Sequence, residues 1–200
     1  SKVINLSAAT VDGTKSIVTY VEEQIDNEVV VYSGTDVTTQ TEGKEGDVFI
    51  VNDPWLLAGH LNDVCVLSPI FFKGKPVAFT ACVFHHSDIG GRVSSDNREV
   101  YEEGIYIPVS KLYDAGKLNE SLLNMIRWNV RTPEEVTGDI RSQVAANHVC
   151  AQKIIEMMAD EGLDTLDDLA DEIISRTETS MRSAIEKIPD GSYSHEGIIE

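Results

Sequence analysis

Three short apolar runs follow one another in the first half of the chain. They occupy residues 47–51, 64–72 and 76–84, and their length and their β-branched and aromatic side chains are typical of strands. Residues 73–75, which read Lys-Gly-Lys, separate the last two runs, and a short segment with a central glycine predicts a tight turn. The pattern therefore predicts an antiparallel hairpin with a further strand before it.

The segment before these runs is less regular. Residues 12–24 carry apolar side chains at helical spacing behind Asp12, a residue type that favours helix N-termini, and they predict a short amphipathic helix. Residues 29–32 are β-branched and aromatic and predict a strand, whereas residues 33–46 are polar, contain glycine and predict a loop. We expect this region to pass from helix to strand to loop.

Three helices are predicted in the second half of the chain. Residues 119–130 start with an asparagine cap, residues 133–161 have a proline in the first turn, and residues 166–188 end at a Pro-Asp-Gly turn. In the last two segments apolar residues recur at helical spacing, so each helix has an apolar face.

These elements together predict an α+β fold. A sheet region that contains the hairpin, over residues of about 28–110, precedes a three-helix scaffold over residues of about 119–188. We expect a single domain over residues 1–200, because a chain of this length can bury one core. Within it, the candidate chemistry falls in residues 46–110 and the helices fall in residues 111–189.

The charge of the chain excludes some classes of partner. There are 34 acidic and 16 basic residues, and the formal net charge of −18 repels nucleic-acid phosphates and anionic membrane surfaces. No apolar run approaches the roughly 20 residues that a membrane-spanning helix needs. The N-terminus also lacks the pattern of a signal peptide. We therefore expect a cytoplasmic protein that binds neither nucleic acid nor membranes.

Polar residues that can bind metal lie at both ends of the predicted hairpin. They are Asn52, Asp53, His60, Asn62 and Asp63 before its first strand, and His85, His86 and Asp88 after its second. Because the strands pair antiparallel, the residue just before the first lies beside the residue just after the second, which brings His60 and Asp63 to His85. Two neutral imidazoles and a carboxylate suit zinc, manganese or iron. Asn52, Asp53 and Asp88 are then available to orient these ligands.

A structural role for the same residues is the alternative. A histidine pair after a strand can simply cap it, and each histidine taken alone favours that role, whereas the convergence of three histidines and three carboxylates favours a metal site. His148 and His195 receive no support from this argument. Gly59 and the pair Gly90 and Gly91 fit equally well a turn or the close approach of a ligand to the backbone.

Four segments in a fixed order carry a resemblance to a known family. They read GDVFIVNDPWLLAGHLNDVCVLSPIFFKGKPVAFTACVFHHSDIGG, EVYEEGIYIPVSKL, NVRTPEEVTGDIRSQVAANHV and IPDGSY, and they span residues 46–193. In these segments the chain resembles the hydantoinase B family, which groups hydantoinase and 5-oxoprolinase B-type subunits with the large subunits of acetophenone and acetone carboxylases. The metal motif of that family falls on His60, Asp63 and His85.

The resemblance implies a metal-binding subunit of a hetero-oligomer that contains a hydantoinase A-type subunit. That partner would bind ATP and magnesium and phosphorylate an oxygen of a small-molecule substrate, since this sequence has no glycine-rich phosphate-binding loop. This chain, with one divalent metal, would complete the hydrolysis of a cyclic amide such as a hydantoin or 5-oxoproline. Asp53 or Asp88 would act as general base, and His86 would donate a hydrogen bond to the developing oxyanion.

Two other functions remain open at this point. A subunit of an ATP-dependent ketone carboxylase would use the same metal and acid–base groups, and a non-catalytic scaffold would only assemble a larger complex. Members of the family are several hundred residues long and have an N-terminal section that contributes an acidic residue to the site, which this chain lacks. We therefore expect a fragment of a larger subunit or one segment of a split subunit.

Overall fold

The computed structural model describes residues 21–25, 28–32, 40–92 and 94–191. The chain divides into two compact units, Ser1–Gly162 and Leu163–Glu200, and each is described by itself. The single domain expected over residues 1–200 stays a prediction. None of the helices in the described part of the chain combines the length and the apolar character needed to cross a membrane.

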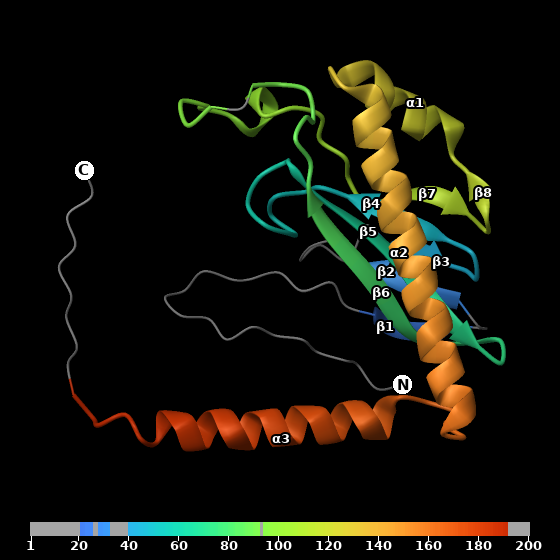
Figure 1. Cartoon of the computed structure of the whole chain (residues 1–200), viewed down its shortest axis with the longest axis vertical. Helices are drawn as coiled ribbons and strands as arrows, with labels where there is room; N and C mark the ends of the chain where they lie inside the picture. The colour runs from blue at the N-terminus through green and yellow to red at the C-terminus, as the bar shows by residue number, and fades with distance from the viewer. Residues whose placement is uncertain (1–20, 26–27, 33–39, 93, 192–200) are drawn as a thin grey trace. The chain divides into compact units, whose positions relative to one another are not determined.

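A five-stranded antiparallel sheet is the larger of two sheets in the first unit (Figure 1). Its strands, in the spatial order β6-β5-β4-β7-β8, are β4 (Val48–Val51), β5 (Asp63–Phe72), β6 (Lys75–His85), β7 (Ser110–Asp114) and β8 (Lys117–Leu118). The three strands predicted from apolar runs are confirmed. The turn between β5 and β6 consists of Lys73 and Gly74, and both have positive φ, at 53° and 75°, as tight hairpin turns require.

A three-stranded antiparallel sheet precedes it in the chain. It consists of β1 (Val21–Ile25), β2 (Glu28–Tyr32) and β3 (Gln40–Gly43), in that order. The strand predicted over residues 29–32 is confirmed. The helix prediction is wrong for residues 21–24, and the loop prediction is wrong for residues 40–43, because both segments form backbone ladders with β2 that outweigh their local preferences. Residues 12–20 and 33–39 lie outside the described residues.

The three predicted helices are confirmed as α1 (Glu120–Asn129), α2 (Pro133–Asp160) and α3 (Asp167–Ile185). The Asn119 side-chain oxygen accepts a 3.1 Å hydrogen bond from the Leu122 backbone N–H and caps α1. Pro133 is the first residue of α2, where its missing N–H costs nothing. A short 3₁₀ helix, η1 (Val100–Glu102), lies between β6 and β7 in the chain. The fold is thus α+β, with the sheets first and the helices after them.

The main core lies between the five-stranded sheet and helices α1 and α2, and Figure 1 shows α2 running across the sheet. Its buried members are Ile50, Leu61, Val64, Val66, Ile89, Ile107, Leu112, Ile126, Val136 and Ile140. Burial of a side chain of this size contributes roughly 1.5–3 kcal/mol. Phe49 belongs to a separate group with Leu67, Phe71, Phe79 and Val109, because neighbouring side chains in a strand point to opposite faces.

Helix α3 belongs to the second unit. The apolar face predicted for it comprises Leu169, Ile173, Ile174, Met181, Ile185 and Ile188, and each of these residues is exposed. None of the residues of α3 is buried within the described part of the chain.

Two glycines beside the predicted metal site should respond very differently to alanine. A Cβ at Gly91, where φ is +53°, would lie 2.3–2.5 Å from backbone atoms of Glu102, Glu103 and Gly104. We expect Gly91→Ala to lower the free energy of unfolding by about 3 kcal/mol or more, since overpacking costs about 1–3 kcal/mol and a left-handed backbone about 1–2 kcal/mol. Gly59 has φ +85° but open space around its Cβ position, so Gly59→Ala should cost only about 1 kcal/mol.

Urea unfolding of the two variants measures this difference. Equal losses would mean that the backbone around Gly91 is not packed as described. The close approach at Gly91 is of backbone to backbone, which favours the structural explanation of that glycine.

Candidate metal centre

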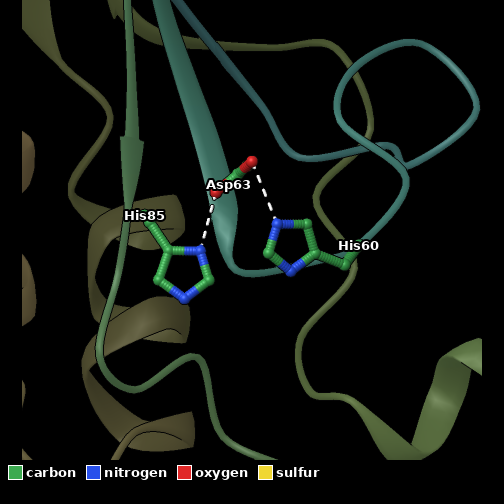
Figure 2. Close-up of side chains that lie close together, drawn as sticks. All are labelled: His60, Asp63 and His85. Carbon is green, nitrogen blue, oxygen red and sulfur yellow. Dashed lines mark hydrogen bonds and ion pairs between the residues drawn. The ribbon is translucent and has the colours of Figure 1, made fainter. Parts of the chain in front are cut away.

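Three side chains meet at the end of the β5–β6 hairpin (Figure 2). Asp63 is the first residue of β5, and its two carboxylate oxygens contact His60 Nε2 at 3.0 Å and His85 Nδ1 at 2.8 Å. The two imidazole rings are stacked, with centroids 4.8 Å apart. One ligand atom from each residue lies within 4.8 Å of the other two. The structure therefore brings together the three residues predicted as metal ligands.

A one-residue shift in the register of the β5–β6 ladder places His85 opposite Asp63. Near the turn Phe71 pairs with Pro76, and an unbroken ladder from that pair would place Phe84 opposite Asp63. The register shifts by one residue beyond Phe71, so that His85 lies opposite Asp63 instead. Strand β6 is at the edge of the sheet, where a bulge and a proline are tolerated. The bulge thus determines which residue faces the carboxylate.

Asp63 supplies a negative charge between the two rings. Partial burial raises the pKa of its carboxyl group, but hydrogen bonds from His85 and His60 lower it more, and the pKa lies below the ordinary value of 3.8. The group is therefore ionised at neutral pH.

The residues fit a divalent cation. Two imidazole nitrogens and one carboxylate oxygen are the donor set that zinc, manganese and iron accept. The side chains of His60 and His85 are 36% and 62% exposed, which leaves room for a substrate or water on the solvent side. A bound cation would replace the hydrogen bonds that the two rings now make to Asp63. Within the described residues, no other trio of His, Cys, Asp and Glu has this geometry.

Asn52 holds the loop that leads into β5. Its side-chain N–H groups donate to the carbonyls of Leu61, at 2.8 Å, and Ile105, at 2.9 Å, and its oxygen accepts from the Ile107 N–H. Asn52 is fully buried, and all of these bonds are internal. Glu103, which the sequence did not single out, accepts a hydrogen bond from the Leu61 N–H at 3.0 Å. Both residues fix the backbone next to His60.

Asp53 caps the turn that follows it. Its side chain accepts from the Trp55 N–H at 2.9 Å, and its carbonyl accepts from the N–H groups of Leu56 and Leu57 at 3.0 Å. Burial of Tyr106, together with its hydrogen bond to Asp53, raises the pKa of the phenol to about 12. Tyr106 is therefore a protonated donor beside the Asp53 carboxylate, and it is a residue that sequence reasoning missed. The general-base role of Asp53 stays a prediction.

His86 points away from solvent, unlike its neighbour His85. Its side chain is fully buried, and Nε2 lies 3.1 Å from the Gln143 side-chain oxygen on α2. Burial lowers the pKa of the His86 ring below its ordinary value of 6.5, although the bond to Gln143 partly opposes this, so the ring is neutral at pH 7. Its predicted role as an oxyanion donor remains untested. Gln143 carries no signal in the sequence that separates it from other polar helix residues.

Asp88 anchors the start of α2. Its carboxylate accepts hydrogen bonds from the backbone N–H groups of Gly90, Arg131 and Thr132 and from the Arg131 side chain. Partial burial raises the pKa of the carboxyl group, but these bonds lower it more, and the net pKa is below the ordinary 3.8. The predicted catalytic role of Asp88 stays a prediction, and the described contacts account for its oxygens structurally.

Comparison with known proteins shows which family the chain belongs to. A profile of the family described as Hydantoinase B/oxoprolinase matches residues 13–200. The chain belongs to this family. This hydantoinase B-type chain is 35% identical over 160 residues to caprolactamase subunit beta of Pseudomonas jessenii. It is 29% identical over 159 residues to the acetophenone carboxylase delta subunit of Aromatoleum aromaticum.

A solved structure confirms that the fold is shared. The crystal structure of the ATP-dependent caprolactamase from Pseudomonas jessenii superposes on this hydantoinase B-type chain with a TM-score of 0.71 at 34% identity, over 79% of the chain. The chain spans 28% of that structure, and 28% and 23% of the lengths of the two relatives above. Both relatives are named as subunits, so each belongs to an assembly of several chains.

Proposed function

We propose that this chain is the metal-binding part of a subunit that hydrolyses cyclic amides, such as hydantoins or 5-oxoproline, in an ATP-dependent complex. The observation that carries the proposal is the meeting of His60, Asp63 and His85 at one end of a hairpin, with their donor atoms within 4.8 Å. The family description, which names hydantoinase and oxoprolinase, and the relative named as an ATP-dependent caprolactamase support this substrate class.

Different residues of the site carry out different steps of amide hydrolysis. His60, Asp63 and His85 would hold a zinc, manganese or iron ion, which would supply Lewis acidity toward the amide oxygen of the substrate. Asp53 accepts a proton from the attacking water as the new C–O bond forms, and this proton then passes to the ring nitrogen as the C–N bond breaks. Tyr106 orients the Asp53 carboxylate. Asp88 is less suited to this step because N–H groups already occupy its oxygens.

ATP belongs to the partner in this proposal. A hydantoinase A-type subunit binds ATP and magnesium and phosphorylates the amide oxygen, which makes the carbon a better electrophile. Attack of water and cleavage of the C–N bond then give an acyl phosphate, and a second water hydrolyses it to the carboxylate and phosphate. The net charge of −18 on this chain opposes the binding of a nucleotide polyanion. The names of the relatives as subunits support a hetero-oligomer.

A ketone carboxylase is the second candidate. The relationship to an acetophenone carboxylase subunit favours it, and the same metal centre would serve the attack of an activated ketone on carboxyphosphate. Both reactions would use the same residues of the metal centre, so the product that forms must distinguish a cyclic amide hydrolase from a ketone carboxylase.

Substrate-dependent ATP turnover tests the proposal. The chain is purified together with its A-type partner and given Mg-ATP with hydantoin, 5-oxoproline, caprolactam, or acetophenone plus bicarbonate. We expect ADP, phosphate and the ring-opened amino acid from at least one cyclic amide. A carboxylated ketone would establish the alternative instead. No turnover with any substrate in a fully assembled, metal-loaded complex would leave the scaffold role.

The assignment of ATP to the partner subunit leads to a prediction about nucleotide binding by this chain alone. Since the described residues contain no phosphate-binding loop and the net charge is −18, the isolated chain should not bind Mg-ATP. Calorimetric titration should detect no binding heat at micromolar protein concentrations. A Kd in the micromolar range or below would assign the nucleotide to this chain and contradict the proposed role of the partner.

A further inference from the structure

One glutamine on α2 binds both strands of the metal-site hairpin. Gln143 is 3% exposed, and its side-chain nitrogen donates to the carbonyl of Val64 on β5, at 2.8 Å, and to the carbonyl of Cys82 on β6, at 2.9 Å. Its oxygen lies 3.1 Å from His86 Nε2. A single amide therefore joins α2 to β5, to β6 and to the residue that follows β6.

The hydrogen bonds of the Gln143 amide determine which ring nitrogen of His86 carries the proton. Both N–H groups of Gln143 point to backbone carbonyls, which can only accept, so its oxygen must be the acceptor for His86. His86 therefore carries its proton on Nε2 and donates it to Gln143. The other ring nitrogen of His86, Nδ1, is buried and has no hydrogen-bond partner among the described residues. Among the described residues, Gln143 is thus the only hydrogen-bond partner of the ring, which also makes an edge contact with Phe84.

These contacts flank the ligands of the proposed metal centre. Val64 follows Asp63, and His86 follows His85, so Gln143 contacts the immediate neighbours of both ligands. A reciprocal backbone and side-chain pair between Asn62 and His86, at 2.8 and 2.9 Å, closes the same end of the hairpin. Strand β6 is at the sheet edge and has only β5 as a neighbour, so α2 is the second support for its end.

We propose that Gln143 is a positioning residue for the metal centre: it fixes the separation and orientation of Asp63 and His85 from behind the hairpin. The inference rests on the proposed metal binding at these residues. Gln143 itself does not touch the metal or the substrate. Residues that orient metal ligands from outside the ligand set typically change affinity by about 10–100-fold when they are replaced.

Asn147 provides a matched control on the same helix. It is also 3% exposed, and it donates one hydrogen bond of 2.8 Å to the carbonyl of Val66 on β5. Val66 lies three residues beyond Asp63 and is not adjacent to a ligand. Gln143→Met and Asn147→Leu each keep the size of the side chain and remove its hydrogen bonds to strand carbonyls. Both should lower the thermal midpoint, but only the first should disturb the metal.

The test is a titration of the metal-free complex with Zn²⁺ in competition with a chelator, and with Co²⁺ followed by its visible absorption. We expect Gln143→Met to weaken both metals by about 10–100-fold and to change the Co²⁺ spectrum, while Asn147→Leu stays within about twofold of wild type. Wild-type affinity and spectrum in Gln143→Met, with a thermal midpoint lowered as in Asn147→Leu, would overturn the positioning role. Absence of Zn²⁺ binding in the wild type would instead reject the metal centre itself.

A second pair of variants keeps the proposal testable if Gln143→Met does not fold. His86→Leu removes one of the three hydrogen bonds of Gln143, together with the ring contact to Phe84, and should weaken Zn²⁺ binding by less than Gln143→Met does. His86→Gln places an amide N–H near the position of Nε2–H and should restore most of the affinity. Equal affinities in wild type, His86→Leu and His86→Gln would also contradict the positioning role.

Discussion

Replacing Asp63 by asparagine should lower the substrate-dependent turnover of the assembled complex by at least about a hundredfold, because the metal that its carboxylate helps to hold is expected to supply several kcal/mol of transition-state stabilisation. Asparagine keeps the shape of the side chain but removes the charge between the two imidazoles. The measurement is the steady-state rate of ADP formation with saturating substrate, together with the metal content of the same preparation.

Asp160→Asn serves as the control for this change. Asp160 is an exposed residue at the end of α2, and the same chemical change there should leave both the rate and the metal content unaltered. Turnover within a few fold of wild type in Asp63→Asn would show that the carboxylate is not part of the reaction. A complex that no longer assembles would be recognised by its size and excluded from the comparison.

Replacing Asp88 by alanine should lower the free energy of unfolding by about 3 kcal/mol. The carboxylate accepts bonds from three backbone N–H groups and one guanidinium, and its removal leaves the start of α2 without acceptors. Urea unfolding at pH 7 measures this loss. A loss below about 1 kcal/mol would mean that water replaces these bonds at little cost.

The same residue predicts a dependence on pH. Since the folded pKa of Asp88 lies below 3.8, its stabilising effect is complete above the pKa of the unfolded chain and disappears as the pH falls through the folded value. The stability difference between wild type and Asp88→Asn should therefore be constant near neutral pH and shrink below about pH 4. A difference that stays constant down to pH 2 would contradict the assigned cause of the pKa shift.

The hairpin and its three candidate ligands could be predicted because apolar runs of nearly equal length determine which residues come to the same end of the ladder. Asp63 precedes one run and His85 follows the other, and the structure pairs them. The prediction did not include the one-residue bulge. A three-residue turn over residues 73–75 already places His85 beside Asp63, and the structure reaches the same pairing with a two-residue turn and a bulge. The metal itself stays a prediction.

Other features could not be predicted because they depend on distant partners. Residues 21–24 end a segment, residues 12–24, whose apolar side chains lie at helical spacing, but the ladder with β2 makes residues 21–24 part of a strand. Gln143 and Asn147 lie among ordinary polar helix residues, and only the packing of α2 on β5 and β6 turns them toward strand carbonyls. The sequence also cannot distinguish the neighbours His85 and His86, of which the first is exposed and the second buried.

The metal content of the complex, purified without chelators, tests the central claim most directly. Elemental analysis should find one zinc, manganese or iron ion per copy of this chain in the wild type, and close to none in His60→Ala and in His85→Ala. His148→Ala, which replaces an exposed histidine on α2, should retain the full amount. A wild-type complex without a stoichiometric divalent metal, or full occupancy in both His60→Ala and His85→Ala, would contradict the metal centre.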